Sequence, residues 1–572
     1  MFLPATRQEM KGLGWERLDV ILVSGDAYVD SSYCGVAVIG RVLAAAGLRV
    51  GVIAQPAVDR GDDIARLGAP ELFWGVSAGA VDSMVSNYTP LMKPRREDDL
   101  TPGGVNNRRP DRASIVYANL IRRAFRRPAP IVLGGIEASL RRIAHYDYWS
   151  DSIRRPLLFD AKADYLLYGM AENSVVELAE ALRAGQSPDG IRGLCRIARE
   201  KHTGYVELPD YEGVAGDKAA FAHMFTLFSR NMDPATANGL VQRCGDRWLI
   251  HNPPPPPLTP EELARVYGLD YERAVHPHCA ALGGVRALDT IRWSITSHRG
   301  CYGECNFCAI AAHQGRRVVS RPEASIVQEA QAVARHPGFR GIIHDVGGPT
   351  ANMYGIECNR KARGACAGKR CIFPGVCGGL AVDHGRQIEL LRRLRAVPGV
   401  KKVFIGSGVR YDLVVADSAN GGRYLDELVQ HHISGQLKLA PEHCEAEVLR
   451  RMGKPSIRVL RRFREMFRLA CERRGKHCFL TYYFIAAYPG CTEAHMRALA
   501  CFAHTELHHR PEQVQIFTPT PSTLGALMYW TGRDPETGQP LFVEKTLAGK
   551  RRQKDLVKGG AVPAGRHPPR PL

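Results

Sequence analysis

Apolar runs alternate with amphipathic stretches between residues 18 and 182. The run LDVILVSGDAYVD is followed by the helix-like segment GVAVIGRVLAAAG and then by the apolar run LRVGVIAQP. Further short apolar runs begin near residues 73, 130 and 163. Strands that alternate with helices and end in glycine-rich turns are typical of an open parallel sheet. The pattern therefore predicts an α/β fold with a Rossmann-like N-terminal domain, whose ligands lie at the carboxyl ends of its strands.

The next part of the chain predicts a domain boundary. No clean period extends over residues 183–246, and a proline run occupies residues 252–260. Consecutive prolines favour an extended polyproline conformation, which is typical of stiff connectors. We therefore expect a Rossmann-like domain with an irregular extension over residues 1–250 and a Pro-rich linker over residues 251–285.

Regular alternation returns from residue 292, where six apolar runs are separated by five amphipathic stretches. The expected strands are RWSITS, GIIHDV, KKVFIGSG, QLKLAPEH, FLTYYFIAAYP and QVQIFTPTPS. Parallel strands joined by helices predict a partial (βα)6 TIM-type barrel over residues 286–535. Such a barrel carries its chemistry on the loops after its strands. The unusual sequences RGCYGECNFC, GGPTANMYG, VRYD, PEHC and YPGCTE follow the first five strands.

Composition and charge narrow the class of protein. Hydrophobic residues make up 45% and charged residues 24% of the 572 residues, which excludes a mainly disordered or coiled-coil protein. The net charge of +19 permits nucleic acid, phosphorylated ligands or anionic surfaces without choosing among them. The segment 536–572 ends in a basic stretch rich in Gly and Pro, which predicts a disordered tail. Apolar runs are too short for a membrane span and no secretory signal is apparent, so we expect a cytoplasmic protein.

Three cysteines follow the first barrel strand with the spacing C-x3-C-x2-C: Cys301, Cys305 and Cys308. Sixteen cysteines in a cytoplasmic chain point to metal binding or catalysis rather than to disulfides. Three thiolates can hold three irons of a [4Fe-4S] cluster and leave the fourth iron open to a ligand. One face of a buried helix is an alternative, but two glycines in the segment disfavour a helix. A structural zinc site, the other alternative, needs a fourth Cys or His nearby.

A second cysteine group lies in a long loop over residues 357–378. Its four members are Cys358, Cys366, Cys371 and Cys377. Their spacings of seven, four and five intervening residues do not match the paired C-x2-C of common zinc modules. Four thiolates are sufficient for an auxiliary iron-sulfur cluster, which we prefer, or for Zn, and reduced unligated cysteines are a third option. Bound metal would offset the entropy of ordering so long a loop.

The triad resembles the hallmark of radical S-adenosylmethionine (SAM) enzymes, which is C-x3-C-x2-C with an aromatic residue before the last cysteine, here Phe307. More closely, the chain resembles the YgiQ family over nearly its whole length. The shared blocks include LGWERLDVILVSGDAYVD, GGIEASLRRIAHYDYWSD, RPDRASIVY, DVGGPTANMYG, GVRYDL, LKLAPEH and FTPTPST. The resemblance implies a [4Fe-4S] cluster on the triad that cleaves SAM reductively. A 5'-deoxyadenosyl radical would then act on an unknown substrate, with a low-potential electron donor as partner.

The resemblance also implies which residues contact SAM. Gly347 and Gly348 are similar to the glycine motif beside the SAM amino group, although Pro349 and Thr350 replace the acidic residue that usually follows. Phe307 would pack near the adenine, with a core aromatic as the equal alternative. Three further candidates for contact with SAM are Ser407, Arg410 and Lys438. For the two charged residues among them, a surface ion pair is the default alternative.

The N-terminal domain resembles the cobalamin-binding domains that precede some radical SAM barrels. The segments GGIEAS and YGMAE are similar to the strand-end motifs of those domains. The sequence has no DxHxxG motif to supply a histidine to cobalt, which argues against cobalamin, although some relatives bind cobalamin without that histidine. His145 and Asp147 in HYDYWSD are candidates for proton transfer. An interdomain contact is the more frequent role of such a segment.

Two classes of function stay open. The first is a radical SAM enzyme whose segments LAPEH and YPGCTE also resemble methylthiotransferases, with RNA or protein as conceivable substrates. The second is a non-catalytic zinc or iron-sulfur protein that binds nucleic acid through its positive surface. The position of the triad after a strand favours the enzyme, because a barrel active site requires that placement.

Overall fold

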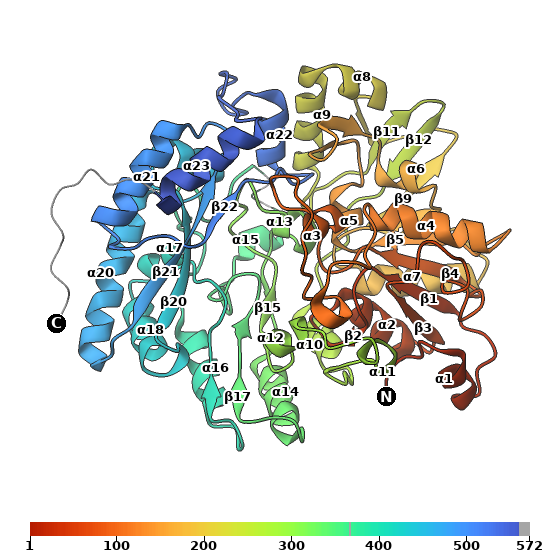
Figure 1. Ribbon diagram of the computed structural model, residues 1–572, viewed down its shortest axis with the longest axis horizontal. Helices are drawn as coiled ribbons and strands as arrows, with labels where there is room; N and C mark the ends of the chain where they lie inside the picture. Colours follow the sequence, from red (N-terminus) through yellow and green to blue (C-terminus); the bar gives the residue numbers. More distant parts are fainter. Residues whose placement is uncertain (365, 367, 560–572) are drawn as a thin grey trace.

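The computed structural model describes residues 1–364, 366 and 368–559. Two α/β halves lie side by side, the N-terminal half drawn red to yellow and the C-terminal half green to blue (Figure 1). No helix in these described ranges is both long and apolar enough to cross a membrane.

A nine-stranded sheet organises the N-terminal half, in the order β10-β11-β12-β9-β8-β5-β4-β1-β3. The five strands from β3 to β8 in that order are mutually parallel, which confirms the predicted open parallel sheet. Their bounds are Val20–Ser24 (β1), Val50–Ala54 (β3), Phe73–Ser77 (β4), Ile131–Gly134 (β5) and Tyr165–Leu167 (β8).

Alternate residues of β1 face two different helical layers, as the period of two requires. Val20 and Leu22 belong to the apolar cluster of helices α2 (Gly35–Ala45) and α7 (Glu172–Arg183). Ile21 and Val23 belong to the cluster that contains the buried face of α4 (Ala113–Ala124). The strand is therefore buried on both sides, which is why it reads as a continuous apolar run.

The predicted irregular extension is in fact part of the sheet. Strands β9 (Leu194–Ala198), β12 (Arg247–His251) and β11 (Leu240–Cys244) pair antiparallel, and β10 (Val206–Leu208) pairs parallel to β11. Helices α8 (Tyr211–Gly216) and α9 (Lys218–Arg230) accompany them. These strands are short and separated by turns, so no helical or parallel-strand period marks them in the sequence.

The segment 251–285 is not a free linker. Helix α10 (Pro260–Tyr267) starts at a capping box formed by Thr259 and Glu262, and it buries Leu263 against the apolar cluster that includes Val38 of α2. Strand β13 (Ala274–Val275) pairs with β2 (Val29–Asp30). The segment therefore packs onto the N-terminal half. Its helix α10 also contacts helix α14 (Glu323–Arg335) of the C-terminal half.

All six predicted strands of the C-terminal half are present. Their bounds are Ile295–Thr296 (β14), Ile342–Ile343 (β17) with Val346–Gly347 (β18), Lys402–Val403 (β19), Gln436–Glu442 (β20), Phe479–Ala486 (β21) and Val514–Ile516 (β22). Parallel pairings join β14 to β18, β17 to β19, and β21 to both β20 and β22. These pairings agree with the predicted parallel strands, while their arrangement in a partial (βα)6 barrel stays a prediction.

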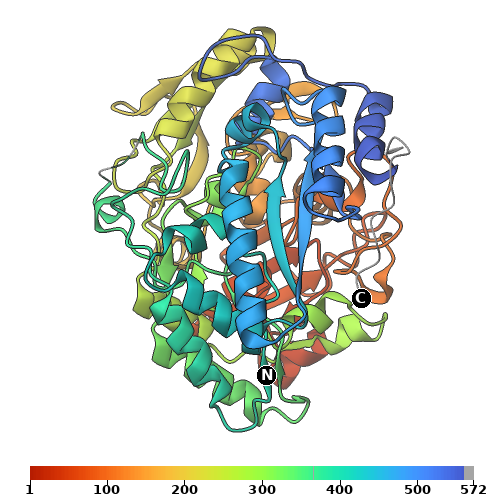
Figure 2. The ribbon, with the colours of Figure 1, turned by 90° about the vertical axis from the view of Figure 1, so that its left-hand side faces the viewer.

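Five helices alternate with these strands, as the sequence predicts. They are α14 (Glu323–Arg335), α16 (Gly385–Arg395), α18 (Gly421–Glu427), α20 (Ile457–Arg474) and α21 (Glu493–Thr505). In Figure 2 the long blue helix α20 runs alongside the strands of this half.

Helix α23 (Leu547–Gly559) corrects the prediction that the segment 536–572 is a disordered tail. The helix contacts α21 and β22. Gln553 is buried and accepts a hydrogen bond from the Ala487 N–H at 3.0 Å. Lys550 is buried too and donates to the hydroxyl groups of Tyr148 and Tyr529 at 2.9 and 2.7 Å. Because the packed face of α23 is largely polar, the helix lacks the apolar periodicity by which a sequence reveals a packed helix. Residues 560–572 of the predicted tail lie outside the described residues.

Candidate functional site

The cysteine triad lies in a loop between strands β15 (His298–Arg299) and β16 (Val319–Ser320), which pair antiparallel. The loop begins at Gly300, whose φ is 83° and whose Cβ, if present, would lie 1.9 Å from the Arg317 carbonyl oxygen. Only glycine fits that turn without strain. The backbone of this position therefore fixes where the loop leaves the strand.

Glycine also keeps space free between the first two thiols. The Gly303 N–H donates to Cys301 Sγ at 3.3 Å. A Cβ on Gly303 would lie 3.2 Å from Cys301 Sγ and 3.6 Å from Cys305 Sγ. Burial raises the pKa of the Cys301 thiol and raises the pKa of Cys308 to about 12. Burial alone therefore favours the protonated form of these two thiols, whereas a bound metal would hold them as thiolates.

The three cysteine thiols fit a [4Fe-4S] cluster by their chemistry, because sulfur ligands suit iron. Three thiolates bind three of the four irons and leave the fourth without a protein ligand. Over residues 1–364, 366 and 368–559, no three His, Cys, Asp or Glu side chains are grouped closely enough to hold one metal ion. Cluster ligands each bind a different iron and so stand further apart than the ligands of a single zinc ion.

Arg410 lies beside the triad rather than free at the surface. Its Nη1 is 3.4 Å from Cys305 Sγ, and its Nε donates to Asp412 Oδ1 at 2.9 Å. Both charged side chains are buried. The guanidinium thus brings positive charge next to the sulfur. The sequence placed Arg410 among residues near SAM, and the structure adds this contact with the triad.

A cavity of about 520 Å³ lies between the two halves of the chain. From the C-terminal half it is bordered by three predicted SAM contacts, Gly347, Gly348 and Ser407. Asp345, which sequence reasoning missed, borders it too and accepts hydrogen bonds from the Gly406 N–H at 2.8 Å and the Ser407 N–H at 3.2 Å. Its position at a strand end, just before the glycines, is the signal that could have found it.

The cavity continues into the N-terminal half as an apolar slot between the sheet and helices α2 and α7. On the sheet side it is lined by Leu22, Phe73 and Val132, and on the helix side by Val36, Ile39 and Val175. Helix α13 (Ile310–Gln314), which follows the triad, contacts α5 (Gly135–Leu140) of the N-terminal half. His313 Nδ1 of α13 lies 3.0 Å from Ser139 Oγ of α5. The helix that follows the triad, three of the predicted SAM contacts and the slot therefore border one interdomain space.

Sequence comparison identifies the family of the chain. Residues 2–294 match the family model described as Radical SAM N-terminal. The UPF0313 protein FN0734 of Fusobacterium nucleatum is 53% identical over 97% of this chain and 98% of that protein. A UPF0313 protein of Thermotoga maritima is 46% identical over 97% of this chain and 98% of that protein. The chain belongs to the UPF0313 family. The predicted resemblance to a radical SAM family of the YgiQ type is thereby confirmed.

The UPF0313 chain also shares its fold with a solved radical SAM structure. The structure is that of the radical S-adenosylmethionine methyltransferase TsrM from Kitasatospora setae, with tryptophan and a SAM analogue bound. The identity is 16%, the TM-score is 0.50, and the match covers 89% of this chain and 75% of TsrM. At that identity the likeness concerns the fold.

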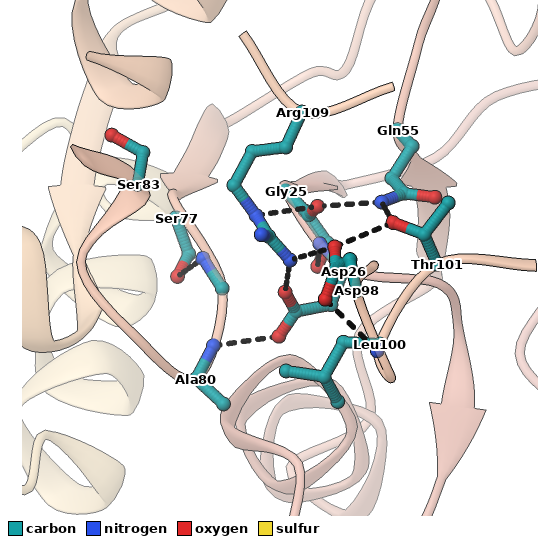
Figure 3. Close-up of polar contacts among 12 residues, drawn as sticks. Gly25, Asp26, Gln55, Ser77, Ala80, Ser83, Asp98, Leu100, Thr101 and Arg109 are labelled. Atoms are coloured by element: carbon teal, nitrogen blue, oxygen red, sulfur yellow. Dashed lines mark hydrogen bonds and ion pairs between the residues drawn. The ribbon is translucent and has the colours of Figure 1, made fainter. Parts of the chain in front are cut away.

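A buried ionic cluster supports the N-terminal wall of the cavity in the UPF0313 chain (Figure 3). Asp26 follows β1 and borders the cavity. Arg109 lies between two carboxylates, with Nη2 at 2.6 Å from Asp26 Oδ1 and 3.0 Å from Asp98 Oδ2. The Ala80 N–H donates to the other oxygen of Asp26 at 2.6 Å. Burial raises the pKa of Asp26, and Arg109 opposes that rise.

Five predicted SAM contacts and catalytic candidates of the UPF0313 chain do not border the cavity: Phe307, Arg410, Lys438, His145 and Asp147. The triad cysteines do not border it either. Phe307 packs edge-on to Tyr488 at 6.4 Å between ring centroids, and it lies against the core as its alternative role states. Lys438 lies within β20, where its carbonyl oxygen accepts a hydrogen bond from the Val409 N–H.

The segment with His145 and Asp147 makes the interdomain contact that was its alternative role. Both residues are buried in β6 (His145–Asp147), and Asp147 pairs with Arg112 at 2.7 Å. Tyr146 stacks on Trp530 of α22 (Leu524–Thr531) with 5.1 Å between ring centroids. We therefore assign no proton transfer to this pair.

Proposed function

We propose that this UPF0313 protein is a radical SAM enzyme that binds a [4Fe-4S] cluster through Cys301, Cys305 and Cys308. The observation that carries the proposal is the closeness of the triad loop to the cavity edge: Cys301 Sγ lies 3.8 Å from Thr350 Oγ1, and Thr350 follows Pro349, which borders the cavity. When bound, such a cluster supplies the electron that cleaves the sulfonium bond of SAM. A low-potential electron donor is the partner this chemistry needs.

The chain's own residues would bind and orient SAM. Gly347 and Gly348 let a ligand approach the backbone closely, since neither carries a side chain. Asp345 fixes the loop of Ser407 by accepting its N–H and its hydroxyl hydrogen. Arg410 keeps its charge at the triad through Asp412. The apolar walls of the cavity would exclude water from the reacting groups.

Anaerobic turnover tests the proposed function. The protein is reconstituted with iron and sulfide, reduced with dithionite and incubated with SAM, and 5'-deoxyadenosine is measured by mass spectrometry. We expect 5'-deoxyadenosine in an amount that rises with the iron content of the triad. Full iron loading without product under several reductants would contradict the enzyme. Zinc alone, together with salt-sensitive RNA binding and no SAM affinity, would favour the non-catalytic alternative.

We also propose cobalamin as a second ligand of the cavity. A TsrM structure with a TM-score of 0.50 and 17% identity to this chain contains cobalamin and a [4Fe-4S] cluster. The expectation against cobalamin, based on the missing DxHxxG motif, is therefore not supported. The apolar slot between the sheet and helices α2 and α7 suits the aromatic base that cobalamin carries on a long arm. With cobalamin bound, methyl transfer, the activity named for TsrM, is the first reaction to test.

Filling the slot should prevent cobalamin binding. Val36→Trp adds a ring to a residue that lines the slot, and overpacking predicts bound cobalamin reduced about ten-fold or more. Val42→Trp is the matched control, because Val42 lies on the same helix against a different apolar cluster. Both variants are mixed with hydroxocobalamin, desalted and measured by absorbance. Equal retention by the two variants would place cobalamin elsewhere or nowhere.

A further inference from the structure

The cysteine-rich loop, residues 357–378, packs directly against the triad loop. Tyr302, the neighbour of Cys301, shares one apolar cluster with Cys371, and Cys358 packs against the same cluster. Lys361 Nζ lies 3.2 Å from Glu304 Oε1, and their side chains are 2% and 9% exposed. Glu304 stands between the first two triad cysteines in the sequence. A buried ion pair and an apolar cluster therefore hold the two cysteine groups together.

Backbone contacts bring the two ends of the cysteine-rich loop together. The Cys377 N–H donates to the Cys371 carbonyl oxygen at 2.8 Å. A β-bridge between Glu357 and Ala381 closes the loop, so that Cys358 at one end returns to the region of Cys377 at the other. Cys358, Cys371 and Cys377 thus belong to one loop whose ends are joined by this bridge.

Cys377 repeats a geometry of the triad. The Gly379 N–H donates to Cys377 Sγ at 3.4 Å, and the Gly303 N–H donates to Cys301 Sγ at 3.3 Å. Both are Cys-x-Gly turns in which the backbone gives a hydrogen bond to the sulfur two residues earlier. Such bonds orient a sulfur, as the groups around metal ligands do.

The charge of the loop is complementary to a thiolate metal centre. Residues 357–378 contain one acid, Glu357, and five bases: Arg360, Lys361, Arg363, Lys369 and Arg370. Four thiolates around a divalent metal or a [4Fe-4S] cluster carry a net negative charge. Nearby lysine and arginine side chains stabilise thiolates. The positive charge of the loop is therefore complementary to the negative charge that such a centre would carry.

We propose that Cys358, Cys371 and Cys377 ligate a second metal centre, with Cys366 as the fourth thiolate. Four thiolates are a ligand set for soft metals, and this set suits either an iron-sulfur cluster or a zinc ion. Because no three of the described side chains are close enough to hold one metal ion, binding would draw these thiols together. The proposal does not depend on SAM chemistry, because metal binding by the loop needs neither SAM nor the triad.

Metal analysis of two variants of the full chain tests the proposal. In the triad triple variant Cys301→Ala, Cys305→Ala, Cys308→Ala, we expect the second centre to stay: about four irons per chain, or about one zinc. Adding Cys377→Ala should lower that metal at least about ten-fold. The Cys377 side chain is exposed, so its truncation removes a ligand without removing core packing. Reconstitution with iron and sulfide, and separately with zinc, distinguishes the two occupants.

Cys501→Ala is the matched control, because Cys501 is an exposed cysteine of α21 far from the loop in sequence. In the same triple-variant background it should leave the metal content unchanged. Far-UV circular dichroism verifies that each variant is folded. A triple variant that binds no metal, or equal metal in the Cys377 and Cys501 variants, would overturn the second centre. Either result would leave 5'-deoxyadenosine formation by the wild-type protein as a separate test of the proposed function.

Discussion

Replacing Cys305 by Ala should lower 5'-deoxyadenosine formation about 1,000-fold or more, because groups that act as a unit lose nearly all activity when one is removed. Cys305 is the middle cysteine of the triad, and Arg410 Nη1 lies 3.4 Å from its sulfur. Without this thiolate an iron would lose its protein ligand and the cluster its fixed position. The iron content of reconstituted protein and the yield of 5'-deoxyadenosine measure the two effects.

Cys444→Ala is the matched control for this variant. Cys444 is also half-buried and follows a strand of the same half, but it lies outside both cysteine groups. The control should keep wild-type iron content and turnover. Thermal unfolding of the two variants without metal should be alike, since each loses one partly exposed thiol. Wild-type turnover by Cys305→Ala would remove the triad from the mechanism.

The local motifs of the site were accessible from the sequence, whereas its long-range partners were not. The triad spacing and the pair Gly347 and Gly348 are contiguous, and three of the predicted SAM contacts border the cavity. Arg109 is separated from Asp26 by 83 residues, so no spacing rule could pair them. Only the folded sheet brings the two side chains together.

The fold, like the site, has features that the local sequence predicts and features that depend on long-range packing. The parallel strands were predicted because burial on both faces leaves a continuous apolar run, as in Val20–Ser24. The slot could not be predicted, because its lining residues have the same apolar character as core residues. Val36 and Val38 are near neighbours on α2, and only the packing of the helix over the sheet decides that both face a space.

The buried charges of the N-terminal domain lie beside the interdomain cavity. Asp26 borders the cavity, yet its carboxylate is occupied by Arg109 and by the Ala80 N–H. Such a group holds strand ends in position and is not available as a free base. Gln55 and Thr101 extend the same network with a hydrogen bond of 2.7 Å. We infer that the cluster positions the wall of the cavity rather than acting on a substrate.

Arg109→Met should therefore lower the free energy of unfolding by about 3–5 kcal/mol, the usual cost of leaving buried charges without their partner. The Arg109 side chain is 0% exposed and faces Asp26 and Asp98, so methionine fills the volume but leaves both carboxylates uncompensated. Urea unfolding followed by circular dichroism measures the loss. Arg286→Met is the matched control, because Arg286 makes an exposed pair with Glu97 at 3.0 Å and should change stability by less than about 1 kcal/mol.

The pH dependence of this loss separates charge from packing. Burial already raises the pKa of Asp26, and removing Arg109 removes a group that opposes the rise. A carboxyl whose folded pKa lies above its unfolded value destabilises the fold above that pKa, and the penalty disappears as the pH falls through it. The deficit of Arg109→Met should thus shrink from pH 7.5 to pH 5, and adding Asp26→Asn should recover part of it at pH 7.5. A deficit that is constant over this range, with no recovery in the double variant, would show that the loss comes from packing and that the buried charges do not hold the cavity wall.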